Sequence, residues 1–165
     1  MIYFKKLKFR LLIFLSFIGM NTYAQIGSQI EDVDVLAEQK RVMIENYPGQ
    51  FREEEIIKVE KKGSKRSIIY YTRNNVNFEA VVNSDRRDLM LIATCEEIPE
   101  SKLPAIVKDN FLQSKSGENK IEKVFLVTTP ISSIFYRIDI TPKGKYKKMK
   151  SLFYSNRGSY MKPPY

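Results

Sequence analysis

The amino-acid sequence predicts an α+β fold of two tandem units, each a helix followed by an antiparallel sheet, with the helices packed on one face of the sheet. Three observations predict it. A stretch with helical spacing of apolar residues precedes a series of short strand-like segments. The same order recurs after roughly 70 residues. Short turns join the strand-like segments, as is typical of antiparallel neighbours.

The first unit is expected over residues 25–97. An amphipathic helix is predicted over residues 30–47, where apolar residues recur at helical spacing and charged residues fill much of the other face. Pro48 and Gly49 end this helix. Strands are then expected over residues 56–61, 67–73, 76–83 and 89–94, which are rich in β-branched and aromatic residues.

The second unit is expected over residues 98–165. Ser101 is the predicted N-cap of its helix, with Pro104 tolerated in the first turn. A turn is predicted at Pro142–Lys145 and a hairpin at residues 156–158. Strands are expected over residues 121–128, 134–141, 146–154 and 159–162.

Residues 1–24 have the pattern of a cleavable secretory signal peptide. Four basic residues precede a short apolar run at 11–20, and Ala24 is a small residue just before the expected cleavage site. A membrane anchor is the alternative, but a spanning helix needs roughly 20 apolar residues. Removing this segment takes four of the 28 Lys and Arg residues, so the net charge falls from +9 to +5. The sequence therefore predicts an exported protein, in the periplasm or the medium.

Residues 98–111 resemble the linker and helix of PepSY-like proteins. Residues 121–124, 135–140 and 152–158 fall where that family has strands and its final turn. This resemblance is best over residues 98–162, and it implies the duplicated fold of beta-lactamase-inhibitor-type proteins. It also implies an exported protein of the bacterial envelope that binds or restrains another protein.

The composition argues against an enzyme. The chain has no histidine, one cysteine and seven scattered glycines, so it offers no catalytic triad, no thiolate metal cluster and no phosphate-binding loop. We therefore expect no catalytic residues, no cofactor and no metal site. Acidic groups at residues 53–55, 85–88 and 96–97 are expected to be solvated. Cys95 lies in an apolar stretch and is expected to be a buried, inert thiol, with a reactive or intermolecular thiol as the alternative.

A cluster of lysines is the first candidate for partner binding. One explanation is an exposed edge strand, on which the lysines prevent pairing with a strand of another chain. The functional alternative is a patch for an acidic protein, anionic lipid or an envelope glycan. Nucleic acid is not expected as a partner of an exported protein, and the oligomeric state stays open. The lysines are Lys143, Lys145, Lys147, Lys148 and Lys150.

Aromatic residues on the predicted strands are the second candidate. Tyr71, Phe135 and Phe153 each belong to a pair of adjacent aromatic residues, so one ring of each pair can face outwards from the sheet. Together with the lysines, these rings would form a concave surface that binds another envelope protein. The alternative is a second buried layer. The face assigned to each ring follows from the alternation of side chains along its strand. A register error of one residue would therefore exchange the two faces.

Overall fold

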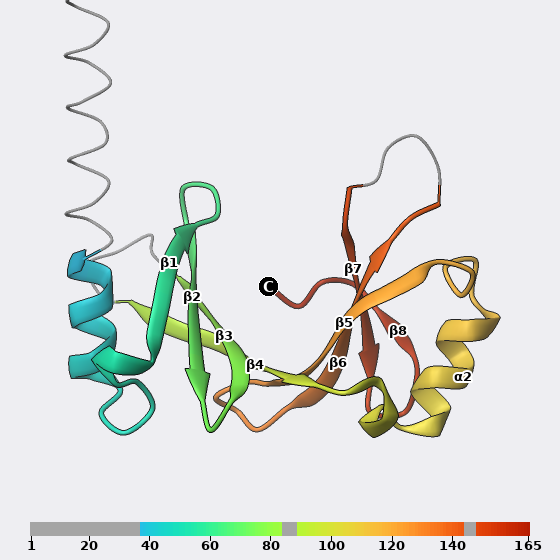
Figure 1. The fold of residues 1–165 in the computed structure, drawn as a ribbon, viewed down its shortest axis with the longest axis horizontal. Coiled ribbons are helices and arrows are strands. Elements are labelled where there is room, and N and C mark those ends of the chain that lie inside the picture. The colour runs from blue at the N-terminus through green and yellow to red at the C-terminus, as the bar shows by residue number, and fades with distance from the viewer. Residues whose placement is uncertain (1–36, 84–88, 144–147) are drawn as a thin grey trace, which may run out of the picture. The chain divides into compact units, whose positions relative to one another are not determined.

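The computed structural model describes residues 37–83, 89–143 and 148–165 (Figure 1). The chain divides into two compact units, Met1–Arg41 and Val42–Tyr165. In the first unit, the described residues 37–41 are helical. The second unit contains every strand named below. None of the helices in the described part of the chain has the length and apolarity needed to cross a membrane. The predicted signal peptide and the acidic residues at 85–88 lie outside the described residues.

The second unit contains an eight-stranded sheet whose strand order follows the sequence. Every neighbouring pair of strands is antiparallel, which confirms the α+β class with an antiparallel sheet. The strands are β1 (Ile56–Lys61), β2 (Arg66–Arg73), β3 (Val76–Asn83), β4 (Met90–Ile98), β5 (Lys120–Thr128), β6 (Ile134–Thr141), β7 (Lys150–Ser155) and β8 (Tyr160–Met161).

The predicted boundary between repeats, at residues 97 and 98, falls at the end of β4. This strand pairs with β3 on one side and with β5 on the other, so one continuous sheet crosses the boundary. The tandem duplication and the packing of both helices on one face stay predictions.

Among the described residues, the helical segments are short. Residues 37–46 are helical, followed by the 3-10 turn η1 (Glu53–Glu55). The second unit also has η2 (Glu100–Lys102) and α2 (Ala105–Gln113). The prediction that Ser101 caps the second helix is wrong: Ser101 lies inside η2, and Pro104 is the N-cap of α2. The physical reason is that a residue before proline avoids the helical region, and Leu103 is accordingly extended.

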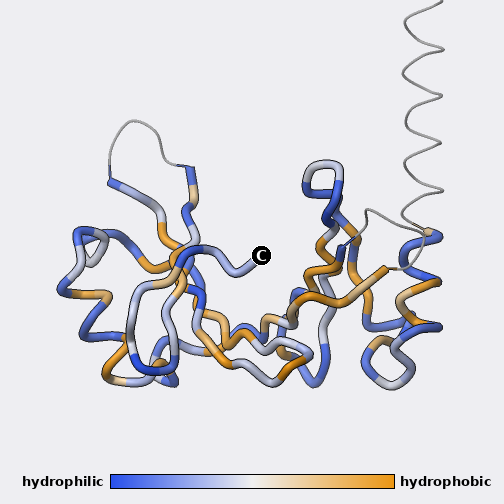
Figure 2. The backbone as a smooth tube through the Cα atoms, turned by 180° about the vertical axis from the view of Figure 1, so that it is seen from behind, coloured by the Kyte–Doolittle hydropathy of each residue, from blue (hydrophilic) through white to orange (hydrophobic). Residues whose placement is uncertain are grey.

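Helix residues pack on the sheet through two apolar clusters. Met43, from the helix at 37–46, is fully buried with residues of β2 and β3, among them Ile69 and Val82. Val107 and Phe111 of α2 are buried in a separate cluster with residues of β5, β6 and β7. Figure 2 shows that the hydrophobic stretches lie mainly in the strands, while the β1–β2 turn is hydrophilic. Burial of these side chains is the main favourable term in the stability of the fold.

Gly158 fastens the β7–β8 turn to α2. Its φ is +83°, and its carbonyl accepts a 3.1 Å hydrogen bond from the side-chain amide of Asn110. A Cβ here would lie 2.5 Å from that amide nitrogen and 2.8 Å from the Ile106 carbonyl oxygen. We expect Gly158→Ala to lower the free energy of unfolding by about 2 kcal/mol, measured by urea denaturation.

Gly63→Ala is the matched control for this substitution. Gly63 has a similar φ of +73°, but nothing lies within 4 Å of its Cβ position. Gly63→Ala should therefore lower the free energy of unfolding only by the cost of a positive φ for alanine, about 1 kcal/mol. Equal losses of stability for the two variants would show that a Cβ at position 158 makes no steric clash with α2.

Candidate functional site: the inner face of the sheet

One face of the sheet carries a continuous set of charged and aromatic side chains that could bind a partner. Directly paired strand residues point to the same face. The register runs from Tyr70 of β2 to Glu79 of β3 and Cys95 of β4. We call this side the inner face, and it carries Lys58, Tyr70, Glu79, Cys95, Glu97, Lys123, Phe125, Val127, Phe135, Arg137, Asp139 and Phe153.

The sheet is bent toward the inner face. Its register shifts at three places: between Ile56 and Lys58, between Val81 and Val82, and between Ile121 and Lys123. Such bulges bend a strand and increase its twist. In a flat sheet β3 and β6 would lie roughly 14 Å apart, at the usual strand spacing. In this sheet Arg137 Nη1 of β6 lies 2.7 Å from Glu79 Oε2 of β3, above β4 and β5.

Arg137 is enclosed on several sides. Its guanidinium carbon lies 3.9 Å from the centroid of the Phe125 ring, and Nη1 lies 3.9 Å from Cys95 Sγ. Nε lies 3.2 Å from Asp139 Oδ1, without the alignment of a hydrogen bond. Burial alone would lower the pKa of Arg137, but the hydrogen bond to Glu79 and the neighbouring negative charges raise it above its usual value. Arg137 is therefore a permanent buried cation that links β3 to β6.

Asp139 makes stability depend on pH. Burial raises its pKa above 3.8, and the nearby Arg137 offsets only part of that shift. Because the folded pKa is raised, the contribution of Asp139 is fully present below about pH 4 and is lost as pH rises through the folded pKa. We expect the stability of Asp139→Asn relative to the natural protein to increase from pH 4 to pH 7, measured by urea denaturation across that range.

Glu55→Gln gives the opposite sign and serves as the control. A hydrogen bond from Arg73 lowers the pKa of Glu55. Its contribution is therefore present above the unfolded pKa and is lost as pH falls through the folded one. The stability difference for Glu55→Gln should grow more unfavourable as pH rises. Parallel pH profiles for Asp139→Asn and the natural protein would contradict the role given to Asp139.

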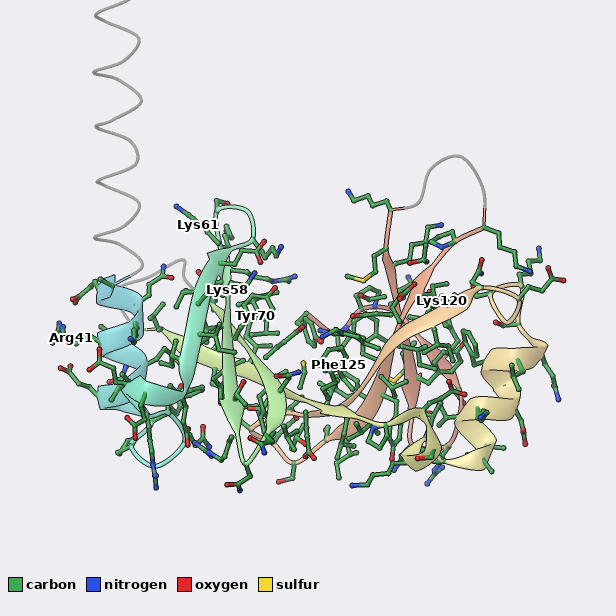
Figure 3. The ribbon with its side chains drawn as sticks, in the orientation of Figure 1. Arg41, Lys58, Lys61, Tyr70, Lys120 and Phe125 are labelled. Atoms are coloured by element: carbon green, nitrogen blue, oxygen red, sulfur yellow. The ribbon has the colours of Figure 1, made fainter. Side chains whose placement is uncertain are left out.

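Side chains of neighbouring strands on this face contact one another, between β1 and β2 and between β4 and β5. The Tyr70 hydroxyl donates a 3.0 Å hydrogen bond to Glu60, and Lys58 Nζ lies 4.3 Å from the centre of the Tyr70 ring. Lys123 Nζ lies 2.9 Å from Glu97 Oε2. Figure 3 shows Lys58 and Tyr70 together on β1 and β2, with Phe125 on β5. These contacts fix the side chains before any partner arrives.

Two cavities open on the inner face. The first, of about 240 Å³, is lined on the inner face by residues that include Tyr70, Lys123 and Phe125, and it reaches Tyr71 and Phe78 of the opposite face at the β2–β3 end of the sheet. The second, of about 570 Å³, is lined by Tyr70, Glu79, Glu122, Lys123, Asp139, Thr141 and Met149. Because Tyr70, Glu79 and Lys123 line both cavities, the two form one continuous surface.

The three aromatic rings predicted for partner binding are buried. Tyr71, Phe135 and Phe153 are exposed by only 4%, 3% and 4%. Tyr71 lies on the opposite face, stacked on Phe78 with ring centroids 5.1 Å apart. Phe135 and Phe153 belong to the inner face but lie beneath the Tyr165 ring. Burial is the alternative that the sequence left open, and a binding role for these rings stays a prediction.

The predicted lysine cluster is only partly described. Lys143, Lys148 and Lys150 are exposed, and Lys143 Nζ lies 3.7 Å from Glu118 Oε2. Lys145 and Lys147 lie outside the described residues. The predicted strand over 146–154 is shorter among the described residues, since β7 begins at Lys150. Lys143 and Lys148 are therefore not strand residues.

Cys95 is buried, as predicted, and burial raises its pKa to about 11. The sequence analysis missed Glu79, Arg137 and Tyr165. Arg137 and Asp139 alternate with apolar residues on β6, a pattern that normally indicates a solvent-facing side. No sequence pattern linked them to Glu79. Among the residues that the structure describes, no group of three or more His, Cys, Asp or Glu is placed to hold a metal ion.

Comparison with known proteins places this fold beside structures from Bacteroides. No family model matches the sequence, and no curated protein matches it significantly. A DUF2874 family protein from Bacteroides uniformis aligns with a TM-score of 0.53 and 12% identity, over 76% of this chain and 86% of that one. A putative periplasmic protein from Bacteroides eggerthii gives a TM-score of 0.52 and 12% identity, over 76% and 84%.

A BLIP-like protein from Bacteroides fragilis aligns with a TM-score of 0.47 and 16% identity, over 76% of this chain and 82% of that one. The PepSY-like resemblance stays a prediction. At these identities the first two similarities show the fold alone: the chain shares the fold of the Bacteroides uniformis and Bacteroides eggerthii proteins.

Proposed function

We propose that the protein is exported to the bacterial cell envelope and binds another protein through the inner face of its sheet. The observation that carries this proposal is the continuous surface formed by the two cavities, which share Tyr70, Glu79 and Lys123. A bent sheet presents such a surface to the convex side of a partner. The expected reaction is reversible association, with no covalent step.

The chemistry of the inner face supports protein binding. Tyrosine and arginine are favoured at the centres of protein interfaces, and polar residues surround them. The inner face has Tyr70 at the cavities, the exposed apolar side chain of Ile57, and the charged side chains of Lys58 and Lys123. Because Tyr70 and Lys123 are already held by Glu60 and Glu97, binding would order few additional side chains.

Two observations support the cellular location. The N-terminal segment has the basic, apolar and small-residue order of a secretory signal. The similar fold from Bacteroides eggerthii belongs to a protein whose description places it in the periplasm. Both are consistent with a role in the envelope.

A binding role also accords with the chemistry of the chain. The sequence has no histidine to act as a general base near neutral pH. Burial raises the pKa of Cys95 to about 11, so this thiol is a poor nucleophile. Charged residues of the inner face form ion pairs with each other, as Arg137 does with Glu79 and Lys123 with Glu97, which is typical of a structural role. We therefore propose that the protein is not an enzyme.

Site-specific photo-crosslinking in the producing cells tests this function. Ile57 is 65% exposed and lines the smaller cavity, so a benzoylphenylalanine at this position samples the inner face. Leu112 of α2 is 53% exposed and is the matched control. We expect a discrete protein adduct from position 57 that position 112 does not give. Adducts of the same mass from both positions, or none from position 57, would exclude the inner face as a docking surface.

A second candidate function is association with anionic lipid or glycan through the lysine cluster. Met149 is 56% exposed between the exposed Lys148 and Lys150, a combination that suits a membrane surface. Binding to phosphatidylglycerol vesicles or to a heparin column should weaken steeply with salt. It should also be lost in a Lys148→Glu, Lys150→Glu double variant. Binding that is insensitive to both changes would exclude this candidate.

A further inference from the structure

Tyr165 lies over an apolar part of the inner face. Its ring centroid is 5.5 Å from that of Phe153, edge-on at 87°, and 6.5 Å from that of Phe135. Its hydroxyl lies 3.4 Å from Cys95 Sγ. The three contacted residues belong to β7, β6 and β4, so the side chain of Tyr165 packs against three strands. The residues that follow β8 therefore return to the inner face.

The recess beneath Tyr165 has the chemistry of a site for a phenol. Its base is a buried cluster of Val81, Ala93, Cys95, Phe125, Val127, Phe135 and Phe153. Tyr165 is half-buried, and the Cys95 sulfur provides a polar partner for its hydroxyl. Edge-to-face packing against Phe153 is a favourable arrangement for two aromatic rings. The recess thus combines aromatic walls with a polar end.

The segment that carries Tyr165 lies outside the strands. Strand β8 ends at Met161, and residues 162–164 are exposed and outside regular structure. Pro163 and Pro164 have no backbone N–H, so they cannot extend the pairing of β8. The contacts of the Tyr165 ring therefore hold this segment against the inner face, and their loss would break no strand pairing.

The recess adjoins the surface proposed for partner binding. Phe125 belongs to the cluster beneath Tyr165 and also lines the smaller cavity. Release of the Tyr165 ring would uncover Phe135 and Phe153, which are 3% and 4% exposed in its presence. Release would thus extend the inner face by an aromatic patch.

We propose that this recess is a receptor for an aromatic side chain, filled by Tyr165 in the free protein and by a tyrosine of the partner in the complex. The partner side of this proposal rests on the proposed function. Tyr165 indicates which ligand the recess binds, namely a phenol ring carried by a short segment outside regular structure. The partner competes for the recess, so Tyr165 restricts binding to proteins that present such a ring.

The reactivity of Cys95 with the disulfide reagent DTNB tests the recess without a partner. Cys95 is the only cysteine of the chain, so the signal reports one site. Removing the ring in Tyr165→Ala should accelerate the reaction by about tenfold or more, because the thiol then becomes accessible without unfolding of the sheet. Tyr165→Phe keeps the ring and should react at nearly the rate of the natural protein. An unchanged rate for Tyr165→Ala would overturn the proposal.

Tyr160→Ala is the matched control. Tyr160 is 64% exposed, and its ring packs on Tyr154 at 5.9 Å, away from Cys95. Its loss should leave the reaction rate unchanged. Measurement at low urea concentrations separates the two routes to the thiol: reaction through global unfolding accelerates with urea, and reaction through an open recess does not. If Tyr165→Ala reacts faster only through global unfolding, the proposal would also be overturned.

Adding back the missing ring completes the test. We expect p-cresol, the side chain of tyrosine as a free molecule, to slow the reaction of Tyr165→Ala saturably, with cyclohexanol less effective. A vacated apolar recess can bind a small aromatic molecule in this way. The absence of p-cresol protection would overturn the receptor. A partner captured at position 57 should likewise protect Cys95 in Tyr165→Ala. Loss of the position 57 adduct alone would overturn the proposed function and leave p-cresol protection intact.

Discussion

Arg137→Met is expected to lower the free energy of unfolding by about 3–5 kcal/mol, since it breaks a buried ion pair by removing one partner. Arg137 and Glu79 have side chains exposed by only 7% and 15%. Methionine fills much of the volume over Phe125 but leaves the carboxylates of Glu79 and Asp139 without their cation. Urea denaturation monitored by circular dichroism measures the loss, because the midpoint shifts in proportion to stability.

Removing the whole charged cluster separates lost pairing from lost packing. A triple variant, Arg137→Met with Glu79→Gln and Asp139→Asn, leaves no buried charge unpaired. Replacement of an entire buried ion cluster is often close to neutral. We therefore expect the triple variant to be clearly more stable than Arg137→Met alone. A triple variant as unstable as the single one would mean that Arg137 acts through its packing on Phe125.

Phe111→Ala is expected to lower the free energy of unfolding by about 3–5 kcal/mol, the usual cost of truncating a fully buried phenylalanine. Phe111 is 1% exposed and lies in the cluster that joins α2 to β5, β6 and β7. With only nine residues, α2 is too short to be stable without this packing. The same urea titration measures the change.

The neighbouring residue provides the control for this prediction. Leu112 is 53% exposed, so Leu112→Ala removes a similar apolar side chain from the same helix with a change within about 0.5 kcal/mol. Because alanine has a higher helix propensity than leucine or phenylalanine, a comparable loss from both substitutions would mean that the buried contact of Phe111 is no more stabilising than the exposed Leu112, and would contradict the prediction.

The strands were predictable because their signals are local. The bounds predicted for β1, β3 and β6 agree with the structure, since alternation and turn residues are read within a few positions. The start of α2 was predicted at Ser101, although the rule that a residue before proline is extended would have placed it after Leu103. This error came from giving the capping residue more weight than the proline.

The site was less predictable because it depends on tertiary structure. The bulge between Val81 and Val82 changes how β3 and β4 align, and strand alternation does not reveal it. The contact between Glu79 and Arg137 follows from the bend of the sheet. Phe135 and Phe153 also pack against the ring of Tyr165, whose segment has no periodic pattern that would place it on the sheet.

The order of the strands bears on how the chain folds. Each strand pairs with its neighbour in the sequence, so the sheet grows by closing one short loop after another. The contact between Cys95 and Tyr165 joins residues 70 positions apart, and that between Glu79 and Arg137 also spans several strands. We expect such long-range contacts to form after the hairpins, because closing a longer loop costs more chain entropy. Weakening these contacts is then expected to speed unfolding and to change the folding rate little.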